Sequence, residues 1–312
     1  MEMNIQRKII QYTGCLLSLL MLQSCFTGVE GTKKITLTKK ELSSVAPTKE
    51  ELYLENIEIE PVGKWQEGRR FKVTDDRLNV VMLSDNTENT LKSGDVIEYA
   101  GIEDRLSPDG NDRSTLVFRK DTELYRLAVD KSYKETIDHY TSSDLPMLID
   151  LTLIEEINGR MAGQTYWTRT PLWYTDDMKY KSGRKYVPVK VTAVEPGDTF
   201  FPVKIQFKDE KGDTSYLLMN IGNSGNDTRG FAKLFMLTDP RKQYRNISDA
   251  TWEAIQRGEI IAGMTKEECR LSVGNPSDTN VGHDYSRQLE IWNYPDGSYI
   301  HFVDDVVVRY RK

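Results

Sequence analysis

The chain has 312 residues, of which 38% are hydrophobic and 29% are charged, and its formal net charge is −6. This acidic balance disfavours nucleic acid and anionic headgroups as partners, because both bind positively charged surfaces. The length is sufficient for two or three domains with ordinary hydrophobic cores.

The N-terminus has the composition of a secretory signal. Arg7 and Lys8 precede an apolar run, Ile9–Leu22, which is shorter than the roughly 20 residues of a typical transmembrane helix. The sequence LQSC at residues 22–25 resembles a bacterial lipobox. In that family the cysteine thiol is lipidated and the preceding peptide is removed, so the resemblance implies acyl chains such as palmitate on Cys25. The alternative is an ordinary secretory signal in which Cys25 has no role.

A lipidated Cys25 would attach a soluble protein to a membrane. One acyl chain binds only marginally, whereas two or three anchor a protein durably. The next residue is Phe26 rather than aspartate, and no acidic cluster follows. By analogy with known lipoproteins, this favours the outer membrane and a location that faces the periplasm.

The cysteine count argues against a disulfide and against a cysteine-based zinc site. Cys15 leaves with the signal and Cys25 carries lipid, which leaves Cys269 alone. We therefore expect no disulfide within the mature chain and no cysteine-based zinc site. No other metal or cofactor is predicted. Cys269 is interpreted as a core residue, with a reactive thiol as the alternative.

Residues 26–50 are rich in lysine, threonine and serine and have few large apolar side chains. This composition is typical of a flexible tether that would hold the folded part away from the bilayer. A helix, or a strand that docks on a partner, is the alternative interpretation.

Two segments beyond the tether resemble each other, with short β-type runs and turn signals at nearly constant offsets. The shared pattern predicts a tandem repeat of small β-domains with no helices between their strands. Pro188 predicts an edge strand at residues 186–191. The matching pairs are 68–73 with 163–168, 92–94 with 181–183, and 116–120 with 203–208.

The first repeat resembles bacterial SH3-like domains. It contains VTDDRLNV at residues 73–80 and LKSGDVI at residues 91–97, where the family has Val-Thr, Leu-Asn-Val-Arg and then Leu-x-x-Gly-x-x-Val. The chain departs from the family at Val81, which replaces an arginine, and it lacks the closing Trp-x-x-Val. The resemblance implies binding of a peptide, glycan or partner protein, and no chemistry.

The C-terminal residues predict two helices and three strands. Ser248 or Asp249 would begin a helix that ends at Gly258. Thr265 and Glu268 have the spacing of a capping box for the second helix. That helix would stop at residues 274–276, and strands are expected at residues 287–294, 298–303 and 306–310.

This region resembles the SmpA/OmlA family of envelope lipoproteins. The matching residues are GMTKEECR at 263–270, GNP at 274–276 and WNYPDG at 292–297. The family includes the small lipoprotein of the outer-membrane β-barrel assembly machine, and its members are non-catalytic scaffolds. Those proteins are usually single small domains, so membership in the fold does not imply the same partner.

No catalytic residue is predicted. His139, His283 and His301 are far apart and lack metal-ligand spacing. An alternative function is a hydrolase or an amidase-associated factor that uses acidic pairs with His139. The acidic pairs are Asp75–Asp76, Asp176–Asp177 and Asp304–Asp305.

The aromatic run at residues 166–174 is the best candidate for a binding site. Rigid aromatic side chains beside a cation suit recognition of peptides or sugars. Half of these side chains could instead point into the core of a β-structure. For Tyr166 and Trp173, both a core role and a binding role stay open. The candidate residues are Tyr166, Trp167, Trp173 and Tyr174.

The sequence therefore predicts a mainly β protein with an α+β part: tandem small SH3-like β-barrels followed by an ααβββ module. We expect a non-enzymatic lipoprotein, attached to the membrane by its lipid, that binds or scaffolds an envelope protein or peptidoglycan at the outer membrane. The expected ranges are 1–24 for the signal, 25–50 for the tether, 51–131 and 146–245 for the two β-domains, and 248–312 for the C-terminal module.

Overall fold

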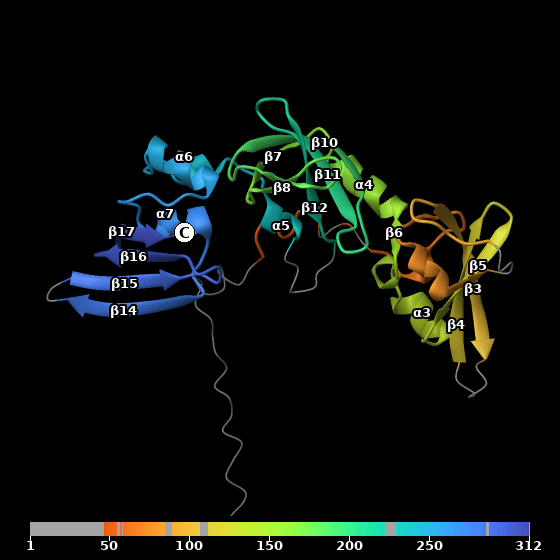
Figure 1. Cartoon of the computed structure of the whole chain (residues 1–312). Coiled ribbons are helices and arrows are strands. Elements are labelled where there is room, and N and C mark those ends of the chain that lie inside the picture. The colour runs from red at the N-terminus through yellow and green to blue at the C-terminus, as the bar shows by residue number, and fades with distance from the viewer. Residues whose placement is uncertain are drawn as a thin grey trace, which may run out of the picture. The chain divides into compact units, whose positions relative to one another are not determined.

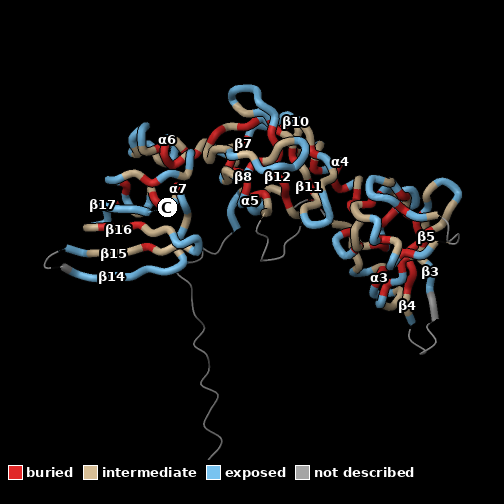
Figure 2. Tube along the Cα trace, viewed as in Figure 1, coloured by how far each residue is buried: buried red, intermediate tan, exposed pale blue. Residues whose placement is uncertain are grey.

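The computed structural model describes residues 47–54, 57, 59–84, 89–106, 112–221, 229–284 and 287–311. The predicted signal, Cys25 and the tether up to residue 46 lie outside the described residues. The described part of the chain is mainly β and contains three sheets (Figure 1). Each sheet has its own hydrophobic core, and the buried residues form separate groups (Figure 2).

The first sheet has six strands whose apolar residues alternate toward one core. Phe71, Phe118 and Leu127 come from three strands and meet there. After the fifth strand, the Ser132 hydroxyl accepts the backbone N–H of Glu135 (3.2 Å) and so begins helix α3 (Tyr133–His139). In spatial order the strands are β2 (Met82–Ser84), β5 (Glu123–Val129), β4 (Asp112–Lys120), β3 (Val96–Leu106), β1 (Arg70–Val73) and β6 (Leu148–Asp150).

The second sheet has seven strands, and helix α4 (Leu151–Met161) packs on its core. Ile154, Ile157 and Met161 are buried there at helical spacing. Helix α5 (Phe231–Leu234) precedes the last strand. In spatial order the strands are β13 (Phe235–Met236), β7 (Thr165–Thr168), β10 (Pro188–Pro196), β11 (Val203–Lys208), β12 (Thr214–Met219), β8 (Leu172–Tyr174) and β9 (Tyr180–Ser182).

The two larger sheets share one connectivity. In each, the last strand of the unit pairs with the first, the strands of the central hairpins follow, and the second strand comes next: β6-β1-β3-β4-β5-β2 and β13-β7-β10-β11-β12-β8. The second sheet has β9 as an additional edge strand beside β8. A local contact also recurs. The N–H of Gly68 donates to the carbonyl of Tyr99 (2.8 Å), and the N–H of Gly163 donates to the carbonyl of Val191 (2.9 Å). Both glycines have positive φ (86° and 81°), a conformation that favours glycine.

The structure differs from the predicted organisation in three respects. β6 lies within residues 146–245 but completes the first sheet by pairing with β1. α4 breaks the expected run of strands without helices. β10 is an interior strand between β7 and β11, and Pro188 is tolerated because it is the first residue of that strand.

The segment before the first sheet contributes to the second core. Ile57 is buried in that core, and Tyr53 and Leu54 pack against it. The Tyr53 ring stacks on Phe231 with ring centroids 4.4 Å apart. The chain then reaches the first core at Val62. Residues 48–54, 57 and 59, called the strap below, therefore belong with the second sheet although the first sheet follows them in sequence.

The C-terminal module has helices α6 (Asp249–Arg257) and α7 (Lys266–Val273) and a third sheet. The predicted capping box at Thr265 and Glu268 is confirmed, and Gly258 ends α6 with φ 68°. The sheet has four strands rather than three, because residues 278–284 also form a strand. In order they are β14 (Asp278–Asp284), β15 (Arg287–Asn293), β16 (Tyr299–Val303) and β17 (Val306–Arg311).

Candidate functional site

The aromatic run at residues 166–174 is divided between two faces of the second sheet. Tyr166 and Trp173 have exposed fractions of 2% and 3% and lie in the second core. Trp167 and Tyr174 are half-buried and point to the opposite face, because successive side chains of a strand alternate. Of the four candidate residues, the structure therefore places two in the core and leaves two on the outer face.

The outer face around Tyr174 is covered by cations of the same chain. The guanidinium carbon of Arg229 lies 5.6 Å from the Tyr174 ring centroid, and Lys204 Nζ lies 4.2 Å from that of Tyr216. Lys204 Nζ also donates to Asp176 Oδ1 (3.1 Å), and this bond lowers the pKa of Asp176 below its ordinary value. Tyr174 and Tyr216 consequently do not offer open aromatic surfaces to a ligand.

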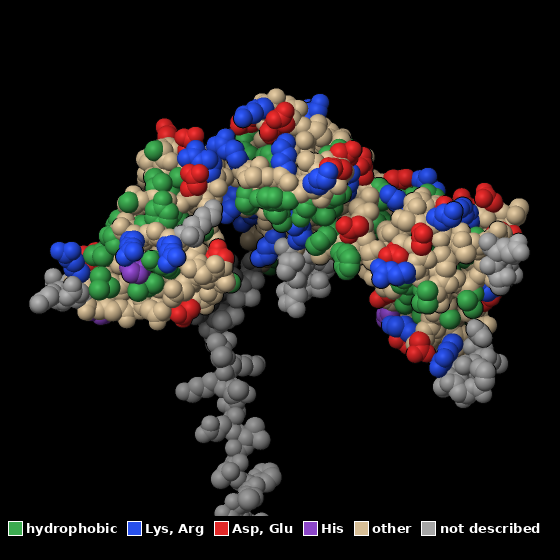
Figure 3. All heavy atoms as spheres, viewed as in Figure 1, with side chains coloured by type: hydrophobic (Ala, Val, Ile, Leu, Met, Phe, Trp, Pro, Cys, Tyr) green, Lys and Arg blue, Asp and Glu red, His purple; other side chains and the backbone are tan. Residues whose placement is uncertain are grey.

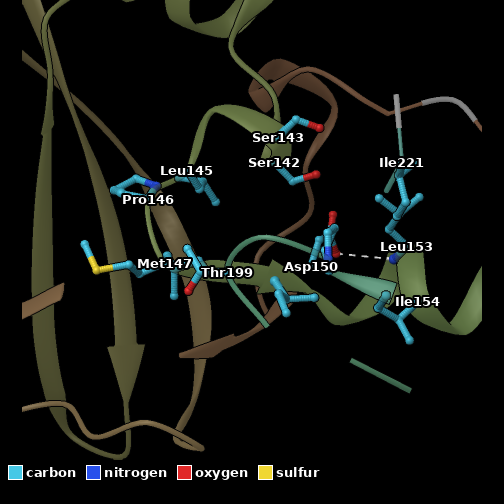
Figure 4. A pocket seen from close by; sticks show the side chains of 13 residues that line it. Ser142, Ser143, Leu145, Pro146, Met147, Asp150, Leu153, Ile154, Thr199 and Ile221 are labelled. Carbon is cyan, nitrogen blue, oxygen red and sulfur yellow. Dashed lines mark hydrogen bonds between the residues drawn. The ribbon is translucent and has the colours of Figure 1, made fainter. Parts of the chain in front are cut away.

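A cavity of about 290 Å³ lies beside the N-terminus of α4 (Figure 4). Asp150 is the one charged side chain among the described residues that line it. Its carboxylate is 1% exposed and accepts from Arg69 Nε (3.0 Å) and Nη2 (2.6 Å) and from the Thr152 N–H (3.0 Å). These donors compensate the buried charge and begin α4, so Asp150 has a structural role.

The residues of the alternative hydrolase prediction lie in different parts of the fold. Asp75 caps the 3₁₀ helix η3 (Asp76–Val80), which connects β1 with β2. Asp176–Asp177 lie between β8 and β9, and Asp304–Asp305 lie between β16 and β17. His139 is the last residue of α3. The structure does not bring these pairs together around His139. Asp176 instead pairs with Lys204, and Asp305 pairs with Lys266.

The face of the third sheet that points away from α6 and α7 is the strongest candidate for a site. Trp292, Ile300 and Phe302 point toward the helices and form the third core, so the residues beside them in sequence point the other way. We call this other side the open face. The strand register divides it into three cross-strand rows: Asp278–Asn293–Tyr299–Arg311, Asn280–Ile291–His301–Arg309 and Gly282–Leu289–Val303–Val306.

The chemistry of the open face changes from row to row. One row is apolar. Its side chains, Leu289, Val303 and Val306, do not belong to the third core. The neighbouring row places His301 beside the exposed Arg309. Figure 3 shows hydrophobic and basic side chains together with a histidine on this module. The face is thus apolar along one row and basic at its β17 side.

The open face was only partly predictable. Alternation within residues 287–294 correctly indicated a strand. Tyr299, Arg309 and Arg311 were not identified as site residues. Alternation separates the two faces of a strand, but it does not tell which face the helices cover.

Cys269 has the environment of a core residue. It is fully buried in the third core, and desolvation raises the pKa of its thiol to about 12. A thiol in this environment is inert because the reactive thiolate is disfavoured.

The described residues contain neither a cluster of potential metal ligands nor a membrane-spanning helix. Among these residues, no group of three or more His, Cys, Asp or Glu side chains is placed to hold a metal ion. Within the same part of the chain, no helix is both long enough and apolar enough to cross a bilayer.

Comparison of the chain with protein-family models, with curated protein sequences and with solved structures finds no match.

Proposed function

We propose that the chain is a non-enzymatic lipoprotein of the cell envelope that scaffolds a partner protein through the open face of its third sheet. In this proposal acyl chains on Cys25 attach it to the outer membrane, and the tether presents the folded part in the periplasm. The lipobox-like residues 22–25 support the anchor. The covered rings of Tyr174 and Tyr216 favour a protein over a glycan strand of the cell wall as the main partner.

The fold assignment within this proposal is two SH3-like domains followed by an SmpA/OmlA-like module. The common strand order of the first two sheets and their recurring glycine hydrogen bonds support a tandem pair. Two capped helices followed by an antiparallel sheet support the C-terminal assignment, with β14 as an added strand. Both resemblances imply binding folds without catalysis.

The observation that carries the proposal is an apolar sheet face that no described helix covers, beside basic side chains. Antiparallel sheets commonly expose one face, but that face is then usually polar. Here the half-buried Leu289, Ile291 and Val303 are on it, and the exposed Arg309 and Arg311 are on its edge strand β17. A protein segment with apolar and acidic side chains fits this pattern by burial of apolar area and by charge.

Site-specific photo-crosslinking in intact cells tests the proposal. A photoreactive amino acid at Ile291 should give a discrete crosslinked product, because this residue is central in the open face. The matched control is Glu253, an exposed residue of α6 on the other side of the module, which should not give that product. The double variant Arg309→Glu and Arg311→Glu should reduce the product at least fivefold. The same product from both positions, or no effect of charge reversal, would contradict the proposal.

The anchor is tested separately by fractionation and by labelling with a palmitate analogue. Wild-type protein should be labelled and sediment with outer membranes. Cys25→Ala should be unlabelled and should leave the membrane fraction. Labelling that persists in Cys25→Ala would refute lipidation at this residue.

A further inference from the structure

The two central strands of the third sheet carry a continuous strip of the open face. Leu289 and Ile291 lie on β15, and Val303 lies opposite Leu289 on β16. These three side chains are half-buried and lie outside the third core. The strip continues along β16 with His301 and Tyr299, whose ring centroids are 5.2 Å apart. Apolar and aromatic side chains therefore follow the direction of the strands.

The backbone under this strip is already paired within the sheet. β15 pairs with β14 and β16, and β16 pairs with β15 and β17. The strip therefore offers side chains but no free ladder groups. An extended segment laid on it would place its own N–H and C=O groups over apolar side chains without partners, which is unfavourable. A helix pairs these groups internally and can bury one apolar stripe.

The dimensions of the strip match a short helix. Its three cross-strand rows are two residues apart, so at about 3.4 Å per residue the strip is about 14 Å long. An α-helix rises 1.5 Å per residue, so about nine helical residues cover this length. Neighbouring strands are about 4.8 Å apart and a helix is about 10–12 Å wide. A helix over β15 and β16 would therefore have β17 along one flank and β14 along the other.

The β17 flank is basic and has no internal counter-charge. Arg309 and Arg311 are exposed on the open face, and no carboxylate among the described residues pairs with either of them. In the first sheet, by contrast, Arg119 on β4 pairs with Glu98 on β3 (3.2 Å). The two guanidinium groups of β17 are thus available to acidic side chains of a ligand.

The β14 flank has a different character. Asp278 Oδ2 accepts from Asn280 Nδ2 (3.2 Å) and from Asn293 Nδ2 (3.5 Å), and no cation among the described residues pairs with it. The open face is therefore basic along one flank and polar to acidic along the other. A ligand that is acidic only where it meets β17 complements both flanks.

Resting on the function proposed above, we propose that the open face binds an amphipathic α-helix of the partner protein that is acidic along one flank. The apolar stripe of this helix would cover β15 and β16. Aspartate or glutamate side chains spaced three or four residues apart share one flank of a helix, and they would reach Arg309 and Arg311. The side chains that face Asp278 would be neutral or basic.

Fluorescence anisotropy with the whole mature protein tests this inference. Three labelled peptides of about 15 residues, roughly four helical turns, serve as probes. The first has leucines at helical spacing and glutamates along one flank, and the second has lysines in place of the glutamates. The third has the composition of the first, rearranged so that leucine and polar residues alternate. At 0.15 M salt, where the screening length is about 8 Å, the first should bind saturably and at least tenfold more tightly than the others.

Variants of the open face locate the binding. Arg309→Glu with Arg311→Glu should weaken binding of the first peptide at least tenfold, and Ile291→Ser at least fivefold. The matched control is Lys242→Glu with Arg245→Glu, which reverses two exposed cations before α6 and should bind as wild type does. Native circular dichroism of each variant shows that a loss of binding does not reflect unfolding.

The outcomes separate this inference from the function on which it rests. No binding of the first peptide, equal or tighter binding of the second or third, or equal losses in the two charge-reversal variants would overturn the helical ligand. If the crosslinked product from Ile291 still forms in cells, the partner site stands and only its helical ligand is wrong. Absence of that product, with the first peptide bound as expected, would instead contradict the scaffolding function.

Discussion

A buried ion pair joins the first strand of the first sheet to the last one. Arg69 precedes β1 and Asp150 ends β6, and their side chains are 10% and 1% exposed. Arg69 also donates to Glu60 (2.7 Å). Such a pair adds little net stability over an apolar replacement of both residues, but loss of one partner leaves a buried charge without compensation.

Arg69→Met should therefore lower the free energy of unfolding by about 3–5 kcal/mol. The matched control is Arg70→Met, because Arg70 pairs with Glu155 on the surface, where the two side chains are 51% and 63% exposed. Its effect should stay below about 1 kcal/mol. Urea unfolding measures both values, and similar losses in the two variants would argue against the structural role of Asp150.

The buried thiol of Cys269 predicts a pH dependence of stability. Its pKa in the folded state is raised to about 12 from an ordinary value of 9.0. As pH rises, the unfolded chain loses this proton first, so the contribution is complete below about pH 9 and is lost as pH approaches 12. Thermal unfolding over this range should show a shallower decline for Cys269→Ala than for wild type. An equal decline of the melting temperature with pH in both proteins would contradict the prediction.

At the scale of elements, the strap is the clearest case of a segment that stabilises a distant part of the sequence. The Tyr53 hydroxyl lies 2.7 Å from the Tyr166 hydroxyl, and Arg160 Nη1 donates to the Tyr53 carbonyl (3.3 Å). Glu50 accepts the N–H of Leu237, just after β13 (3.2 Å). These contacts attach the strap to the second sheet.

Tyr53→Ala should loosen the second sheet and leave the first one intact. Loss of the ring removes its stacking on Phe231 and its contact with Tyr166. Because Tyr53 is only partly buried, the loss of stability should be smaller than the about 3–5 kcal/mol for a fully buried ring. Hydrogen exchange should accelerate in β7 and β11 but not in β4. The neighbouring Leu52→Ala is the control, because Leu52 is 39% exposed. Faster exchange in β4 would show that the strap supports both sheets.

At the scale of the whole molecule, residues 184–186 connect the second sheet with the C-terminal helices. The Lys185 N–H donates to the Gln256 carbonyl (2.9 Å), and its ammonium group donates to the Ser272 carbonyl at the end of α7. Tyr186 packs on the third core. The ammonium group suits the negative end of the helix dipole, although burial lowers the pKa of Lys185.

Lys185→Ala should lower the stability of the C-terminal module by about 1.5–3 kcal/mol, the usual cost of losing a hydrogen bond from a charged group. Calorimetry should show this as an earlier transition of that module. Lys190→Ala, at an exposed position of β10, is the control. If the module unfolds at the same temperature in both variants, Lys185 does not support α7.

Local features of the fold were predictable because they depend on residues a few positions apart. Thr265 and Glu268 are three residues apart, and their reciprocal bonds to each other's backbone define the start of α7. Gly258 ends α6 for an equally local reason, since its positive φ favours glycine. Residues 287–293 alternate, and β15 forms there.

Features that depend on distant residues were missed. β14 has the sequence DTNVGHD, which lacks apolar alternation, so its strand character comes from its pairing with β15. β6 has three residues, and its membership in the first sheet rests on β1, far earlier in the chain. The strap was counted with the domain that follows it because sequence order carries no information about which core it packs on.

The amino-acid sequence by itself determined the helix caps, the alternating strands of the C-terminal module and the mainly β character of the chain. These are set by backbone geometry and by side chains close together in sequence. The tertiary structure alone decided which aromatic residues are core and which face of the third sheet the helices leave open. Each of these depends on which distant segment covers a surface, and strand alternation is the same whether a face is covered or exposed.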